Sequence, residues 1–140
     1  MFETIYNNHG TIITFDEETD VIRIGLKCCP SNEEIDRMWT VLSTFINNHV
    51  YKCILHLVHV ETQQLEPPGL QTMMHIVSTI LSEHKELASQ CRRIFIQPKY
   101  IDDKVRFAQQ LFLKLMPSTL KITIASDQSV IDDAMQQIAN

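Results

Sequence analysis

Apolar residues occur along the chain with two kinds of spacing, and each spacing predicts a type of secondary-structure element. Two β-rich runs, residues 11–15 and 21–26, flank an acidic turn at residues 16–20, which predicts an antiparallel hairpin. Residues 53–60 are almost continuously apolar, as expected of a central strand that is covered on both faces. Two further strands are predicted at residues 93–97 and 120–125.

Four segments of the chain have apolar residues at helical spacing, and each predicts a helix. The first helix should open with a capping box, Ser31 with Glu34, and end near residues 47–49. The second is expected to run unbroken from Leu70 to Leu87. A third stops before Pro117, and the last is capped at Ser126 or Asp127. The inward residues expected on the last two helices are Val105, Ala108, Leu111, Phe112, Leu115, Val130, Ile131, Ala134 and Ile138.

The predicted order of elements is ββαβαβαβα, with short connections and no repeat. Strands that alternate with helices require right-handed crossovers, which make the sheet mostly parallel, and the opening hairpin adds an antiparallel edge. A length of 140 residues with 44% hydrophobic content fits one core. We therefore expect an α/β fold in a single domain, residues 1–140, with a mixed, mostly parallel sheet of about five strands and four helices.

Charge and hydropathy narrow the class of partner. The net charge is −5, and residues 1–70 carry four Lys or Arg against ten Asp or Glu, so a nucleic-acid-binding surface is not expected. No apolar run approaches the length of a membrane span, and the first residues lack the layout of a signal peptide. The sequence thus favours a soluble, cytoplasmic protein in a reducing compartment, without direct membrane insertion.

The residues that carry chemistry form no recognisable catalytic or metal-binding pattern. The four cysteines include no C-x-x-C pair, so reduced thiols are expected. His56 and His59 should lie on opposite faces of one strand, which argues against a shared metal. No nucleophile elbow or phosphate-binding glycine loop is present. We expect no catalytic residues, no metal and no cofactor, hence a protein that is not an enzyme.

The junction Glu66-Pro67-Pro68-Gly69-Leu70 leads from the apolar strand directly into the second helix. Helix N-termini present free backbone N–H groups, which often hold an anion or a phosphorylated side chain. Two prolines in the first turn should remove two of these donors, and the turn lacks a hydroxyl. The junction is therefore expected neither to bind an anion nor to be phosphorylated.

The order of elements and this junction together resemble the STAS domain, the module shared by bacterial anti-sigma factor antagonists and the cytoplasmic tails of sulphate transporters. Members of that family carry an apolar strand, a turn of the form Asp-Ser-Ser-Gly-Leu and an amphipathic helix, and Glu66 to Gln71 occupy the matching place. Residues 93–97, 105–116, 121–125 and 127–135 follow the family's closing pattern, so the resemblance covers nearly the whole chain. In signalling members a serine of the turn accepts phosphate and thereby switches partners. With Pro67 and Pro68 at both following positions, the resemblance implies a degenerate turn without a phosphoacceptor.

These observations predict a non-enzymatic STAS-like module for protein–protein interaction, acting as a constitutive binding or regulatory adaptor. Its partner, another protein, should contact the loop of residues 60–70 and the exposed start of the following helix. The expected partner-binding residues are His59, Gln63, Gln64, Glu66, Pro67, Pro68, Gly69 and Leu70. One alternative is a structural subunit fixed within a larger assembly. Another is a small-ligand-binding domain that uses His59, Gln63 and Gln64 near the carboxyl end of the central strand. Self-association, through basic residues near Arg92 and the acidic N-terminal half, is a further possibility.

Overall fold

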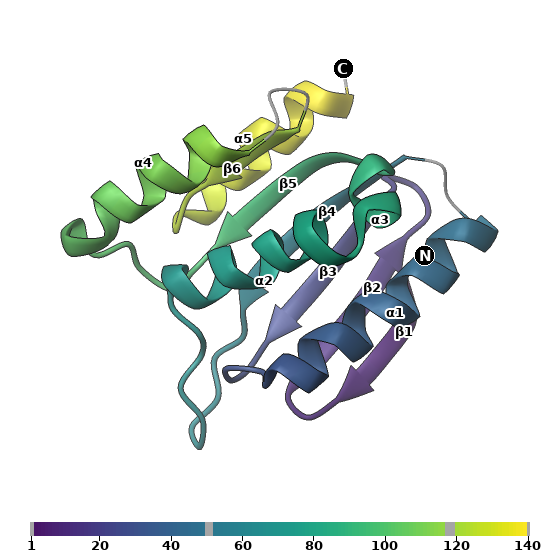
Figure 1. Ribbon diagram of the computed structural model, residues 1–140, viewed down its shortest axis with the longest axis horizontal. Helices are drawn as coiled ribbons and strands as arrows, with labels where there is room; N and C mark the ends of the chain where they lie inside the picture. Colours follow the sequence, from purple (N-terminus) through teal and green to yellow (C-terminus); the bar gives the residue numbers. More distant parts are fainter. Residues whose placement is uncertain (1, 50–51, 117–119, 140) are drawn as a thin grey trace.

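The computed structural model of the protein describes residues 2–49, 52–116 and 120–139, and its centre is a mixed sheet of six strands (Figure 1). The strands are β1 (Phe2–Asn8), β2 (Thr11–Asp16), β3 (Val21–Leu26), β4 (Cys53–His59), β5 (Cys91–Gln97) and β6 (Lys121–Ile124). The α-helices are α1 (Asn32–His49), α2 (Leu70–Glu83), α3 (Lys85–Ser89), α4 (Arg106–Leu115) and α5 (Gln128–Ala139), with a 3-10 turn, η1 (Asp103–Val105). The expected α/β fold with a mixed sheet is confirmed, with one more strand and one more helix.

The strands lie in chain order, β1 to β6. β1, β2 and β3 are antiparallel neighbours, and β3 to β6 run parallel to one another. The additional strand is β1, whose sequence FETIYNN lacks apolar–polar alternation and ends in two asparagines, so it gave little strand signal; pairing with β2 supplies the missing support. Gly10 is required in the turn between them, because its φ is +81° and an added Cβ would lie 2.8 Å from Cys28 Sγ.

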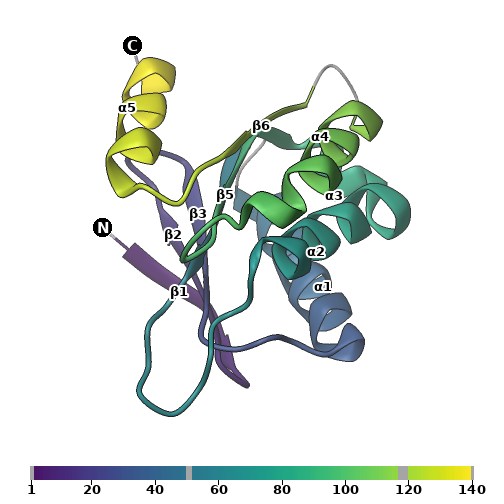
Figure 2. The ribbon, with the colours of Figure 1, turned by 90° about the vertical axis from the view of Figure 1, so that its left-hand side faces the viewer.

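Helices cover the two faces of the sheet unequally, as Figure 2 shows. α1 to α4 lie on one face, because right-handed crossovers between successive parallel strands place every connecting helix on the same side. α5 follows the last strand and lies on the opposite face. Within residues 2–49, 52–116 and 120–139, no helix combines the length and the apolar character that crossing a membrane requires.

The central strand is buried on both faces, as its continuous apolar run predicted. Leu55 and Leu57 pack into the large core beneath α1, α2 and α3. Ile54 instead joins Phe95 and Ile131 of α5 in a smaller cluster on the other face. The strand therefore connects two hydrophobic layers. This burial holds in place the carboxyl end of the strand, from which the following loop leaves the sheet.

The second helix is broken, and the expectation of one helix from Leu70 to Leu87 is wrong. α2 ends before His84, whose backbone angles (φ −133°, ψ 59°) are not helical, and α3 begins at the next residue. Neither proline nor glycine is present at the break. The change of direction buries Leu87, which packs in the main core, and brings α3 against α1. Apolar spacing identified the buried face but carried no signal for the change of axis.

A chain of side-chain hydrogen bonds attaches α5 to the sheet. His56 Nε2 lies 2.7 Å from Gln97 Oε1, and Gln97 Nε2 donates to Gln128 Oε1 at 3.0 Å. Gln128 Nε2 in turn donates to Asp132 Oδ1 at 2.8 Å. Because Gln97 donates through its nitrogen, its oxygen accepts from His56, so the ring carries its proton on Nε2. Burial lowers the pKa of His56 below its ordinary 6.5, and the bond to Gln97 partly opposes that shift.

This buried imidazole should make the protein less stable in mild acid. As pH falls through 6.5, His56 of the unfolded chain takes up a proton while the folded ring stays neutral to a lower pH. The unfolded state then binds more protons, so the free energy of unfolding decreases until the lower folded pKa is passed. Urea unfolding on either side of pH 6.5 measures the decrease, and His56→Gln, which keeps a donor to Gln97, should show a smaller one. Equal pH dependence in both proteins would contradict the assignment.

Candidate functional site

A hollow of about 450 Å³ lies where the carboxyl ends of β3, β4 and β5 meet. Residues 66–72 of the β4–α2 connection form one wall, and Cys29, from the loop after β3, contributes to it. Lys99, Tyr100 and Val105, from the segment that joins β5 to α4, form the other. This edge is where open α/β sheets place ligands, because the loops that leave parallel strands converge there.

The prolines of the junction precede α2 rather than occupy its first turn. Gly69 is the N-cap, and the first intrahelical bond runs from the Met73 N–H to the Gly69 carbonyl oxygen at 3.1 Å. Pro67 and Pro68 therefore lie outside the helix, and the expectation that they remove two of its donors is wrong. The chain stays extended through Gly69 (φ −82°, ψ −178°), which starts the helix later than the sequence suggested. The N–H groups at the start of α2 consequently have no intrahelical acceptors.

Gly69 is not required by the fold. Its φ is one that any residue adopts, and an added Cβ would meet no atom within 4 Å. Among the described residues no side chain caps the helix, although Ser or Asp at this position would do so and would stabilise it by roughly 0.5–1 kcal/mol. Glycine here leaves the backbone at the mouth of the hollow open to close approach by another molecule.

The long loop between β4 and α2 has one internal contact and one contact to a neighbouring segment. The Thr62 hydroxyl accepts from the Leu65 N–H at 3.0 Å and makes a second bond with the Leu65 carbonyl oxygen at 3.2 Å. Lys99 Nζ pairs with Glu61 Oε1 at 3.0 Å, which joins this loop to the segment after β5. Both side chains of this ion pair are more than half exposed, so it contributes at most about 1 kcal/mol to holding the two segments together.

The structure separates the expected partner-binding residues into two groups. Glu66, Pro67, Pro68, Gly69 and Leu70 all line the hollow. The other three lie nearer β4 or at the exposed loop tip, and none of them lines it: His59, Gln63 and Gln64. The half-buried ring of His59 has Nδ1 3.5 Å from the Gln97 carbonyl oxygen, so it is used to join β4 to β5.

The outer side of α4 is apolar, which the sequence analysis missed. Phe107, Leu111 and Leu115 are 77%, 48% and 72% exposed, and their spacing places them on one face of the helix. We call these three residues the α4 apolar face. Leu111 and Leu115 were expected to point inward, and that expectation is wrong; Phe112 is buried on the inner side. Val130 of α5, also expected to point inward, is exposed.

The misassignment has a physical cause. α4 carries one apolar stripe through Ala108 and Phe112 and a second through the α4 apolar face, and a ten-residue helix needs only one stripe to reach the core. Periodicity alone does not show which stripe is buried. The signal that the sequence does contain is the number of apolar residues in this helix, which is larger than one buried face can accommodate and so indicates that a second apolar face is exposed.

The site combines several groups suited to recognition. Glu66 and Asp102 flank the hollow with carboxylates, Tyr100 is 65% exposed beside it, and α4 begins immediately after its wall residue Val105. Cys29 Sγ lies 3.9 Å from Thr72 Oγ1. Among the described residues, no histidine lines the hollow, so the cysteine has no imidazole base there.

Comparison with protein-family models, with curated protein sequences and with solved structures found no significant match to this chain. Its function is therefore inferred from the geometry of the site and from the resemblance of the junction.

Proposed function

We propose that the chain is a protein-recognition module whose partner binds across the hollow and the α4 apolar face. The observation that carries the proposal is the exposure of Phe107, Leu111 and Leu115 along one side of one helix. Isolated exposed apolar residues are ordinary, but a continuous apolar surface beside a hollow marks an interaction site.

A partner protein fits the hollow better than a small molecule does. Small-ligand sites surround roughly 70–90% of their ligand's surface. Seven of the twelve residues around this hollow are exposed: Cys29, Glu66, Gly69, Gln71, Lys99, Tyr100 and Asp102. Such an open, partly charged surface receives a side chain that projects from a partner, while the helix face supplies the apolar contact.

The junction at residues 66–70 supports a more specific proposal, which is that the module is a STAS-like adaptor whose binding is not switched by phosphorylation. An apolar strand, a turn that ends in Gly69-Leu70 and an amphipathic helix follow one another as the resemblance implies. Neither proline offers a hydroxyl, and Thr72 lies within α2. Binding is accordingly constitutive and non-catalytic in this proposal. Four free cysteines, with Cys53 and Cys91 buried, support placing the protein in the reducing cytoplasm.

A charge reversal at the rim of the hollow tests the proposal. Glu66→Lys should reduce capture of the partner from an extract of the native cells a few-fold, because rim charges influence mainly the rate of association. The melting temperature should hardly change, since Glu66 is exposed. The matched control is Glu86→Lys on α3, a charge reversal at another exposed residue, outside the hollow. Equal capture by both variants would count against the proposed surface.

Size-exclusion chromatography of the same extract separates an adaptor from a fixed structural subunit. An adaptor should elute partly as free protein, whereas a subunit should appear only in a large assembly.

A further inference from the structure

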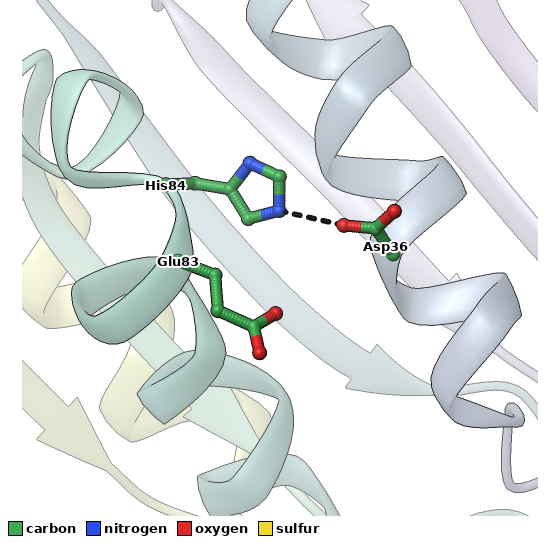
Figure 3. A group of neighbouring side chains, drawn as sticks. All are labelled: Asp36, Glu83 and His84. Carbon is green, nitrogen blue, oxygen red and sulfur yellow. Dashed lines mark hydrogen bonds and ion pairs between the residues drawn. The ribbon is translucent and has the colours of Figure 1, made fainter.

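Three side chains with metal-ligating atoms meet on the flank of the helical layer, away from the hollow (Figure 3). Asp36 projects from α1, and Glu83 and His84 project from the end of α2 and the break that follows it. One ligand atom from each residue lies within 4.8 Å of the other two. The group joins two helices, and Asp36 is 48 positions from His84 in the chain.

The break in the second helix creates this arrangement. Consecutive residues of a regular helix point about 100° apart, so Glu83 and His84 would not face one common point. The non-helical backbone of His84 turns its ring toward α1, as Figure 3 shows, while Glu83 still extends from the last turn of α2. The His84 N–H keeps its bond to the Ile80 carbonyl oxygen, and its own carbonyl oxygen accepts from Ala88. The backbone at the break is therefore held at both ends.

The distances suit a small divalent cation. His84 Nε2 lies 3.1 Å from Asp36 Oδ1. Tetrahedral zinc with ligand bonds of about 2.0–2.2 Å holds its ligand atoms roughly 3.3–3.6 Å apart, so a small adjustment would admit the ion between them. The His84 side chain is only 17% exposed and so keeps its orientation, while the Asp36 side chain is 65% exposed and free to adjust.

The charges favour a cation as well. Two carboxylates and one imidazole converge, and no Lys or Arg pairs with any of the three among the residues that the structure describes. The Glu83 side chain makes neither a hydrogen bond nor an ion pair within that part of the chain. Its carboxylate is thus available as a ligand, and a nitrogen with two carboxylate oxygens is a set that zinc and its neighbouring metals accept.

We propose that Asp36, Glu83 and His84 form a site for a divalent transition-metal ion such as Zn²⁺, with water at the remaining position. The bound ion would clamp α1 to the α2–α3 break and stabilise the helical layer. This inference is independent of the proposed protein-binding function, because the metal site and the hollow share no residue. No motif in the sequence indicates this site, since the ligands come from separate helices.

A neighbouring contact provides the matched control. His75 of α2 lies with Nε2 3.4 Å from Asn32 Oδ1 of α1, so it bridges the same two helices as His84 does. There the α1 partner is a neutral amide rather than a carboxylate. His75→Ala therefore removes a histidine between the same helices without touching the proposed ligands.

Titration of untagged protein with Zn²⁺, followed by calorimetry and by the melting temperature, tests the site. Zn²⁺ should raise the melting temperature of the wild type and of His75→Ala, while His84→Ala and Asp36→Asn should bind at least about tenfold more weakly. Co²⁺ should give visible d–d bands without the intense near-ultraviolet charge-transfer bands of thiolate ligands. Thiolate bands, or an equal Zn²⁺ response in all four proteins, would overturn the proposal. Circular dichroism of each variant establishes that it is folded.

Discussion

Replacing Phe107 and Leu115 together by glutamine should weaken partner binding by about thirtyfold or more, which corresponds to at least about 2 kcal/mol. Large apolar side chains that are exposed in the free protein and buried in a complex commonly carry that much binding free energy. Both residues lie on the outer side of α4 and are more than 70% exposed, so the core loses nothing. Glutamine also favours helices, and we expect the free energy of unfolding to change by less than about 0.5 kcal/mol.

Binding of the purified partner to this double variant, measured by calorimetry, gives the effect directly. The control is Val130→Gln on α5, which makes the same change at an exposed apolar residue on the opposite face of the sheet. The control should bind like the wild type. If Val130→Gln weakened binding as much as the double variant did, the effect would reflect a general loss of surface hydrophobicity rather than a contact at α4.

Trp39→Ala should lower the free energy of unfolding by about 3–5 kcal/mol, the largest effect on stability that we expect from one substitution. Trp39 is completely buried on the inner side of α1, and its indole N–H donates to Thr79 Oγ1 of α2 at 2.7 Å. The Thr79 hydroxyl donates in turn to the Ile76 carbonyl oxygen at 2.7 Å. Alanine would leave a cavity between the sheet and the two helices and would remove the hydrogen bond between them.

Urea unfolding of a set of variants separates the packing contribution from the hydrogen bond. Thr79→Val removes the acceptor and leaves the buried indole N–H unpaired, which should destabilise the protein by about 1–3 kcal/mol. Thr44→Val, on the exposed side of α1, changes a threonine whose hydroxyl donates to the Thr40 carbonyl oxygen of the same helix and should have little effect. An effect of Trp39→Ala no larger than that of Thr44→Val would contradict the packing described here.

Local patterns of the sequence predicted most of the fold, because the buried face of a helix or strand requires apolar residues at regular intervals along the chain. The strand at Cys53–His59 was evident from its unbroken apolar run, and both of its faces are buried. The first helix begins as expected, with the Glu34 N–H donating to Ser31 Oγ at 3.2 Å. The Glu34 side chain, however, accepts from the hydroxyl of Tyr6 in β1 instead of completing the capping box, and β1 is a strand that the sequence did not predict.

The candidate site was predicted only in part, because it depends on contacts between distant segments. The turn at Glu66 to Leu70 was identified from its residues alone and lines the hollow. Tyr100 and the α4 apolar face depend on how α4 rotates against the sheet, which the helical period does not determine. The metal-ligand group arises only after α2 breaks at His84, and no pattern in the sequence marks that change of axis.

Site-specific photo-crosslinking in the native cells tests the proposed recognition surface most directly. A photoreactive phenylalanine analogue would replace Leu111, at the centre of the α4 apolar face, or Thr44, which is exposed on α1. The proposed surface predicts a discrete adduct with one partner protein from position 111 and none from position 44. The same adducts from both positions, or none from position 111, would contradict it.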